Sequence, residues 1–100
     1  MGYLKVAQTT EIPDGEGRSY EVDGKAVAVF NVHGTFYALD NTCPHRGGPL
    51  GEGYLEEKVV TCPWHGWRFD VATGACSANP ATQVLQYPLK VAGTDILVEV

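Results

Sequence analysis

Hydrophobic and polar positions fall into short stretches that predict a chain built mainly from β-strands. Residues 18–22 alternate between polar and apolar, and residues 25–32 form a nearly continuous apolar run rich in β-branched side chains. The dipeptide Asp23-Gly24 between them is a common hairpin turn. We therefore expect an antiparallel hairpin whose second strand is buried.

The same strand and turn pattern continues along the chain and returns at its end. A tight turn at residues 33–34 leads into a strand at 35–39, and a strand at 86–91 is followed by a turn at 92–95 and a strand at 96–100. Consecutive strands that are joined by short turns pair antiparallel. The outer parts of the chain thus predict an all-β antiparallel meander or sandwich.

The middle of the chain, about residues 41–79, departs from this pattern because Gly, Pro, Cys, His and Trp concentrate there. No window of ten residues keeps a helical period, and only residues 10–15 and the stretch after Leu50 are compatible with a helical turn. Functional residues often lie in loops that a rigid scaffold positions. We predict one domain, residues 1–100, in which a loop-rich subdomain at about 41–79 is inserted in a β base.

Composition and charge exclude several classes of protein. The chain has 100 residues, 44% of them apolar and 19% charged, which is typical of one globular domain. The formal charge of -5 has the wrong sign for binding a nucleic-acid backbone. No apolar run approaches the roughly 18 residues that span a bilayer, and the first residues do not resemble a secretion signal. We expect a cytoplasmic protein that binds neither nucleic acid nor membrane.

Two short clusters carry the candidate chemistry. Cys43 and His45 lie in the sequence C-P-H-R-G-G, and Cys62 and His65 lie in C-P-W-H-G-W. Each cluster offers one thiolate, which is a soft anionic ligand, and one neutral imidazole. Thiols of a cytoplasmic protein stay reduced, so the cysteines favour metal binding over disulfides. We expect the two loops to converge on one metal site.

Three kinds of site fit this quartet. A structural zinc site of Cys2His2 composition is disfavoured, because zinc sites usually take both thiolates from one C-x2-4-C turn. Four side chains without a metal would require two matched clusters to arise by chance. An iron-sulfur cluster needs four terminal ligands, and two neutral imidazoles in place of two thiolates lower its negative charge and raise its reduction potential.

The two motifs and the Thr73-Gly74 that follows them resemble those of Rieske-type [2Fe-2S] ferredoxins, the ferredoxin components of bacterial oxygenase systems. The resemblance covers about a third of the chain and implies the Rieske fold. It implies that Cys43 and Cys62 bind the buried iron. It also implies that His45 and His65 bind the outer iron through Nδ1, with Nε2 near the protein surface.

Three positions depart from the high-potential branch of this family. Gly48 and Trp64 stand where respiratory-complex members have a pair of disulfide-forming cysteines, and Trp67 stands where those members have a serine that donates a hydrogen bond to a bridging sulfide. Fewer hydrogen bonds to sulfur stabilise the reduced state less. The resemblance is therefore to the low-potential branch.

Several residues around the quartet have candidate supporting roles. The glycines Gly47, Gly48 and Gly66 lie beside ligands, where a missing Cβ would let backbone N–H groups approach sulfur; a simple turn with positive φ is the alternative. The aromatic residues are expected to exclude water and pack the loops; they are Tyr54, Trp64, Trp67 and Phe69. An exposed Trp64 that contacts a partner is the alternative.

The remaining cysteine and histidine are expected to have no part in the chemistry. Cys76 is predicted to be a small apolar residue, because the quartet is complete without it. His33 is predicted to be a solvated turn residue. With His45 and His65 used as ligands, too few histidines remain for a second, mononuclear iron site.

The resemblance implies a soluble one-electron carrier and not an enzyme. Its electron donor would be an NAD(P)H-dependent flavoprotein reductase, and its acceptor a terminal oxygenase such as an aromatic-ring-hydroxylating dioxygenase. Such a carrier would be monomeric or associate transiently. The alternative from the same family is the small subunit of an assimilatory nitrite reductase, and a zinc-binding module is a third possibility.

Overall fold

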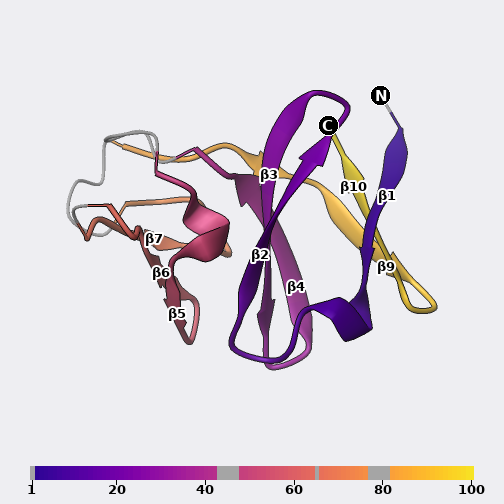
Figure 1. Cartoon of the computed structure of the whole chain (residues 1–100), viewed down its shortest axis with the longest axis horizontal. Coiled ribbons are helices and arrows are strands. Elements are labelled where there is room, and N and C mark those ends of the chain that lie inside the picture. The colour runs from indigo at the N-terminus through magenta and orange to yellow at the C-terminus, as the bar shows by residue number, and fades with distance from the viewer. Residues whose placement is uncertain (1, 43–47, 65, 77–81) are drawn as a thin grey trace.

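The computed structural model of the chain describes residues 2–42, 48–64, 66–76 and 82–100, which form three antiparallel sheets (Figure 1). The first sheet has the order β1-β10-β9, with β1 at Tyr3–Gln8, β9 at Leu89–Ala92 and β10 at Asp95–Glu99. The first and the last strand of the described chain therefore belong to the same sheet, and a short 3-10 helix, η1 at Thr9–Glu11, leads out of it.

The second sheet forms the middle layer and has the order β2-β3-β4-β8. Its strands are β2 at Gly17–Val22, β3 at Lys25–Val32, β4 at Thr35–Asp40 and β8 at Gln86–Tyr87. The β2–β3 and β3–β4 hairpins predicted from the sequence are both present. Their turns contain the residues expected there, with positive φ at the positions that require it.

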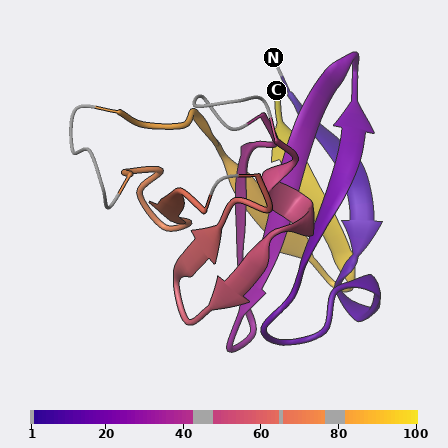
Figure 2. The same cartoon turned by 60° about the vertical axis from the view of Figure 1, so that its left-hand side comes forward.

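The third sheet is small and lies in the chain segment between β4 and β8, which pair with each other. It has the order β5-β6-β7, with β5 at Tyr54–Glu56, β6 at Val59–Thr61 and β7 at Arg68–Asp70. A second 3-10 helix, η2 at Leu50–Glu52, precedes it. Figure 2 shows this sheet standing beside the middle layer, on the side opposite the first sheet in Figure 1.

The apolar run of β3 explains this arrangement. Val27 and Val29 point into a core shared with the first sheet, whereas Ala28, Phe30 and Val32 point into a core shared with the third sheet. Successive side chains of a strand point to opposite faces, so a strand buried on both faces is apolar throughout. The two faces of the middle sheet thus pack against two different hydrophobic cores.

The C-terminal strand prediction was partly wrong. The single strand expected at 86–91 is divided at Pro88 into β8, which pairs with β4, and β9, which pairs with β10. Proline has no amide N–H to donate to a ladder, and here it marks the point where the chain passes from one sheet to the other. The strands β1, β5, β6 and β7 were not predicted.

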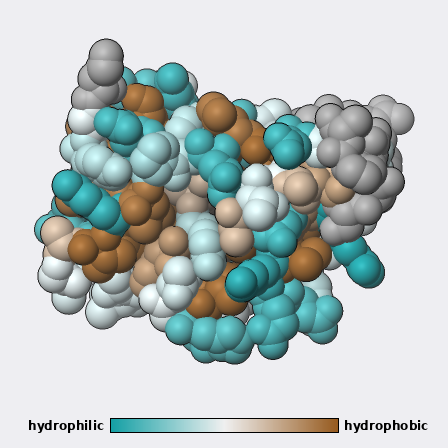
Figure 3. Space-filling model, turned by 180° about the vertical axis from the view of Figure 1, so that it is seen from behind, coloured by the Kyte–Doolittle hydropathy of each residue, from teal (hydrophilic) through white to brown (hydrophobic). Residues whose placement is uncertain are grey.

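Two surface features complete the description. Figure 3 shows hydrophobic atoms at several places on the face turned away in Figure 1. In the first sheet, Leu4 of β1 and Val91 of β9 are exposed. Among the described residues, no helix has the length and hydropathy that crossing a bilayer requires.

Candidate iron-sulfur site

The root of the first predicted ligand loop is closed by hydrogen bonds around Asn41. Thr42 and Pro49 form an isolated β-bridge, and the amide of Leu50 donates to the Asn41 carbonyl at 2.8 Å. The side-chain oxygen Oδ1 of Asn41 accepts a further hydrogen bond from the Gly51 amide at 2.7 Å. The described chain before Cys43 and after Gly47 is thus held at neighbouring points of the fold.

The second predicted ligand loop connects β6 to β7. Thr61 and Arg68 pair across the two strands, and the Cys62 amide donates to the Trp67 carbonyl at 2.7 Å. Within the turn, the Trp64 amide donates to the sulfur Sγ of Cys62 at 3.4 Å. The Cys62 thiol therefore has a backbone N–H directed at its sulfur.

The two loops touch at Gly48. A Cβ atom added to Gly48 would lie 2.8 Å from Cys62 Sγ and 3.0 Å from Trp64 Cγ, so only a glycine fits between them. This contact joins the end of the first motif to the beginning of the second. The structure thus places Gly48 of the first motif against Cys62 and Trp64 of the second, and the convergence of the four ligands on one metal site stays a prediction.

Four of the predicted site residues lie outside the described residues: Cys43, His45, Gly47 and His65. Their roles remain predictions. Among the residues that the structure does describe, no group of three or more histidine, cysteine or acidic side chains is placed to hold a metal ion. This finding leaves the predicted quartet untested, because three of its four members are not included.

Cys62 lies at the edge of an apolar core. Its exposed fraction is 1%, and it packs in one cluster with fully buried side chains that include Leu50, Val60 and Phe69. Cys76 belongs to the same cluster with an exposed fraction of 2%. Burial of Cys76 agrees with the prediction that it acts as a small apolar residue.

The aromatic residues of the region differ in their surroundings. Phe69 is fully buried and Trp67 packs partly buried against the same core, as expected for residues that exclude water. Trp64 is half exposed at 51%, and Tyr54 is exposed at 68%. The prediction that Tyr54 packs in the core or against the loops was wrong, because alternate residues of β5 face opposite sides and Leu55, not Tyr54, points inward.

The glycines predicted to support the site also divide into two kinds. Gly48 makes the close approach to Cys62 described above. Gly66 instead has a φ of +75°, and no described atom lies within 4 Å of where its Cβ would be. Its described surroundings therefore favour the alternative, a turn that needs a positive φ.

His33 was correctly predicted to lie exposed in a turn, but sequence reasoning missed its interactions. Its Nε2 lies 2.7 Å from Glu57 Oε2, and its Nδ1 lies 3.5 Å from Asp14 Oδ2. These partners are 24 and 19 residues away in the sequence, so no local pattern could have indicated them.

The described part of the site fits the cysteine side of an iron-sulfur centre. A buried thiolate needs compensation for its lost hydration, which an amide N–H and a metal ion can both provide. Cys62 has the amide of Trp64, and the missing side chain at Gly48 leaves space beside its sulfur. A side chain at Gly48 would occupy the position next to the ligand atom.

Comparison with known proteins agrees with these observations. The family model described as the Rieske [2Fe-2S] domain matches residues 2–89. The chain is 39% identical over 90 residues to the ferredoxin component of the naphthalene 1,2-dioxygenase system of Pseudomonas aeruginosa, which covers 89% of this chain and 86% of the relative. It is 38% identical over 101 residues to the biphenyl dioxygenase ferredoxin subunit of Pseudomonas sp. strain KKS102, covering 99% and 93% of the two chains.

Solved structures give the same result for the fold. The ferredoxin of carbazole 1,9a-dioxygenase from Nocardioides aromaticivorans IC177 superposes with a TM-score of 0.89 at 35% identity, covering 98% of this chain and 97% of that one. A nitrite reductase small subunit described as putative, from Mycobacterium tuberculosis, has a TM-score of 0.89 at 24% identity, covering 97% and 93%. The second match shows a shared fold alone. The chain belongs to the Rieske [2Fe-2S] domain family.

Proposed function

We propose that this protein is a ferredoxin that carries single electrons from an NAD(P)H-dependent flavoprotein reductase to a terminal oxygenase, such as an aromatic-ring-hydroxylating dioxygenase. The observation that carries this proposal is the similarity, at 38–39% identity and over most of both chains, to the naphthalene and biphenyl dioxygenase ferredoxins. The contact of Gly48 with Cys62 supports it from the structure, because it joins the two motifs on which a [2Fe-2S] cluster depends.

In this proposal the quartet divides between two irons. Cys43 and Cys62 would bind one iron through their thiolates, and His45 and His65 would bind the other through neutral imidazoles. The cluster supplies a centre that gains and loses one electron, at a potential raised by the two neutral ligands. The protein's task is to hold these ligands still and to limit the access of water.

The described residues around Cys62 perform part of that task. The Trp64 N–H donates to Sγ and so stabilises negative charge on the sulfur. The hydrogen bond from the Cys62 amide to the Trp67 carbonyl fixes the turn, and the antiparallel β6–β7 pair holds both of its ends. Fully buried Phe69 and Leu50 make the surroundings apolar. A ligand held in this way moves little when the charge of the site changes.

The rival functions have weaker support. The nitrite reductase small subunit from Mycobacterium tuberculosis shares the fold but only 24% identity, below the level of the dioxygenase ferredoxins. A zinc module conflicts with membership of a [2Fe-2S] family. We therefore keep the proposal of an electron-carrying ferredoxin. The oxygenase would be the component that performs the chemistry on the substrate.

The location and the state of association are part of the proposal. Thiolate ligands require reduced cysteines, and this favours a cytoplasmic location. A carrier has to leave one partner before it meets the next, so we expect a monomer that associates transiently. Its net charge of -5 favours partners with basic docking surfaces.

Reconstitution with defined partners tests the proposed function. The purified protein is mixed with a flavoprotein reductase, NADH and a Rieske-type terminal oxygenase, and product formation is measured with and without the ferredoxin. We expect product only when the protein is present, and none with Cys62→Ser, which removes one proposed ligand. A protein that dithionite reduces, but that neither accepts electrons from the reductase nor passes them to the oxygenase, would contradict the carrier role.

A further inference from the structure

A charged bridge connects the tip of the β5–β6 hairpin to the middle sheet. His33 occupies the β3–β4 turn, Asp14 lies in the segment between η1 and β2, and Glu57 forms the turn between β5 and β6. The three residues are called the His33 strap here. It joins two sheets through side chains of exposed residues, with exposed side-chain fractions between 60% and 72%.

The two carboxylate contacts of the strap favour protons on both nitrogens of the imidazole ring. Nε2 faces Glu57 Oε2 at 2.7 Å, and Nδ1 faces Asp14 Oδ2 at 3.5 Å. A neutral imidazole has one N–H and one lone pair, so one of its nitrogens would then face a carboxylate oxygen without a proton between them. Only the doubly protonated, cationic ring can donate to both carboxylates.

The backbone holds His33 in place for this contact. The amide of His33 donates to Asp14 Oδ1 at 2.7 Å, and the Gly34 amide donates to Asn31 Oδ1 at 2.8 Å. His33 and Glu57 both adopt positive φ, of 53° and 55°, which places the two side chains at the tips of their turns. The two nitrogens of one ring also point in different directions, so the strap is not a site for a single metal ion.

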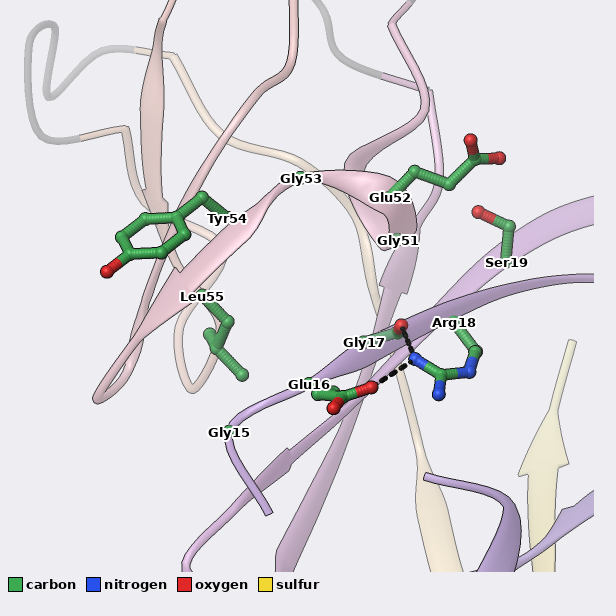
Figure 4. A pocket seen from close by; sticks show the side chains of 10 residues that line it. All are labelled: Gly15, Glu16, Gly17, Arg18, Ser19, Gly51, Glu52, Gly53, Tyr54 and Leu55. Atoms are coloured by element: carbon green, nitrogen blue, oxygen red, sulfur yellow. Dashed lines mark hydrogen bonds and ion pairs between the residues drawn. The ribbon is translucent and has the colours of Figure 1, made fainter. Parts of the chain in front are cut away.

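The rest of the hairpin is attached to the middle sheet differently. At its root, Gly51 packs against the backbone of β2, where an added Cβ would lie 2.6 Å from the Arg18 carbonyl oxygen. A hollow of about 550 Å³ beside this contact is lined by residues 15–19 and 51–55 (Figure 4). Within this hollow, Arg18 bonds to Glu16 and to the Gly17 carbonyl and not to the hairpin. The strap therefore adds an exposed contact at the hairpin tip to the packed contact at its root.

We propose that the His33 strap is a pH-dependent fastening that positions the β5–β6 hairpin: the doubly protonated ring holds the hairpin tip to the middle sheet, and loss of one proton to solvent releases it. β6 ends at Thr61, directly before Cys62. Release of the tip therefore loosens the strand that leads into the proposed ligand loop. This last consequence rests on the proposed function, whereas the strap itself does not.

The direction of the pH dependence follows from the two carboxylates. The hydrogen bond to Glu57, followed by the charges of Glu57 and Asp14, raises the pKa of His33 above its ordinary value of 6.5. A group whose pKa is raised by folding stabilises the fold fully below its unfolded pKa, and this stabilisation is lost as the pH rises through the folded value. Asp14 and Glu57 are the charged groups that act on the ring within the described part of the chain.

The test uses NMR on the purified holoprotein between pH 5.5 and 9. The His33 ring signal, identified by its absence in His33→Asn, should titrate with a pKa above 6.5. Asparagine tolerates the positive φ at this position, so the variant keeps the turn. Glu57→Gln should lower this pKa more than Asp14→Asn does, because Glu57 makes the shorter contact.

Hydrogen exchange of backbone amides measures how firmly the β5–β6 hairpin is held. Protection factors of the β5 and β6 amides should fall roughly two- to five-fold as the pH rises through the His33 pKa, the range expected of an exposed ion pair. They should show no such fall in His33→Asn. The matched control is Asp95→Asn, which breaks an exposed ion pair of the first sheet, Lys5 Nζ to Asp95 Oδ1 at 3.4 Å, and should leave the fall unchanged.

Two results would refute the proposed role of the His33 strap. One is a His33 pKa at or below 6.5, and the other is the same pH dependence of protection in the wild type and in His33→Asn. Iron content measured on the same samples separates the two proposals. If the protein holds no iron but shows the raised His33 pKa, the proposed function is refuted and the role of the strap stands. If the protein holds iron but its His33 pKa is not raised, the role of the strap alone is refuted.

Discussion

Gly48→Ala tests whether the contact between the two loops matters for the metal site. The added Cβ would lie 2.8 Å from Cys62 Sγ and 3.0 and 3.1 Å from Cγ and Cβ of Trp64. Non-bonded heavy atoms pack at about 3.5–4.0 Å, so the sulfur or the loop has to move by roughly 0.7–1.2 Å. Metal–ligand distances tolerate about 0.2 Å. The displacement is therefore several times larger than a ligand position allows.

We expect two measurable effects of Gly48→Ala. Overpacking of this kind costs about 1–3 kcal/mol, so the free energy of unfolding in urea should fall by that amount. Iron and acid-labile sulfide per folded chain should also fall, because Cys62 Sγ no longer lies where the cluster needs it. The visible absorption of the remaining holoprotein reports the same loss independently.

Gly17→Ala is the matched control. The same substitution there meets the ring atoms Cδ1 and Cε1 of Phe30, at 2.5 and 2.6 Å, in the contact between β2 and β3 and not at Cys62. It should lower the free energy of unfolding without lowering the iron content of the folded protein. If Gly48→Ala keeps the iron content, spectrum and stability of the wild type, the inferred contact between Gly48 and the ligand sulfur is refuted.

Two further substitutions separate packing from metal binding. Phe69→Ala removes a fully buried ring and should cost about 3–5 kcal/mol in urea unfolding; a loss below 1 kcal/mol would show that the core can collapse around the missing ring. Cys76→Ser puts a hydroxyl into an apolar cluster and should lower the free energy of unfolding by about 1–3 kcal/mol. Its iron content should stay at the wild-type value, and a drop would make Cys76 a candidate ligand.

The hairpins of the middle sheet were predictable because their signals are local. Asp23-Gly24 and His33-Gly34 supply the positive φ values that tight turns need, and the apolar run between them has the length of one strand. Burial of β3 was expected from its nearly continuous apolar run. Nothing beyond neighbouring residues was required for these predictions.

The third sheet escaped prediction for a physical reason. Its strands β5, β6 and β7 have three residues each, which is less than two periods of alternation. Pairing with neighbours, not local pattern, makes them strands. The exposure of Tyr54 could not be deduced for the same reason, since the face of a strand is set by its register.

The site shows the same division between local and distant information. The types and spacing of the candidate ligands could be predicted from the two motifs, because metal chemistry restricts which residues can act as ligands. The contact of Gly48 with Cys62 and the bridge from His33 to Glu57 join residues 14 and 24 positions apart, and only the fold brings them together. Sequence alone therefore indicated the chemistry but not the supporting contacts.

The most direct test of the central claim is Mössbauer spectroscopy of the oxidised protein enriched in ⁵⁷Fe. A [2Fe-2S] cluster held by Cys43 and Cys62 on one iron and by His45 and His65 on the other has two inequivalent iron sites. The account predicts two quadrupole doublets of equal area with different isomer shifts. A single doublet, from one iron or from two equivalent irons, would contradict it.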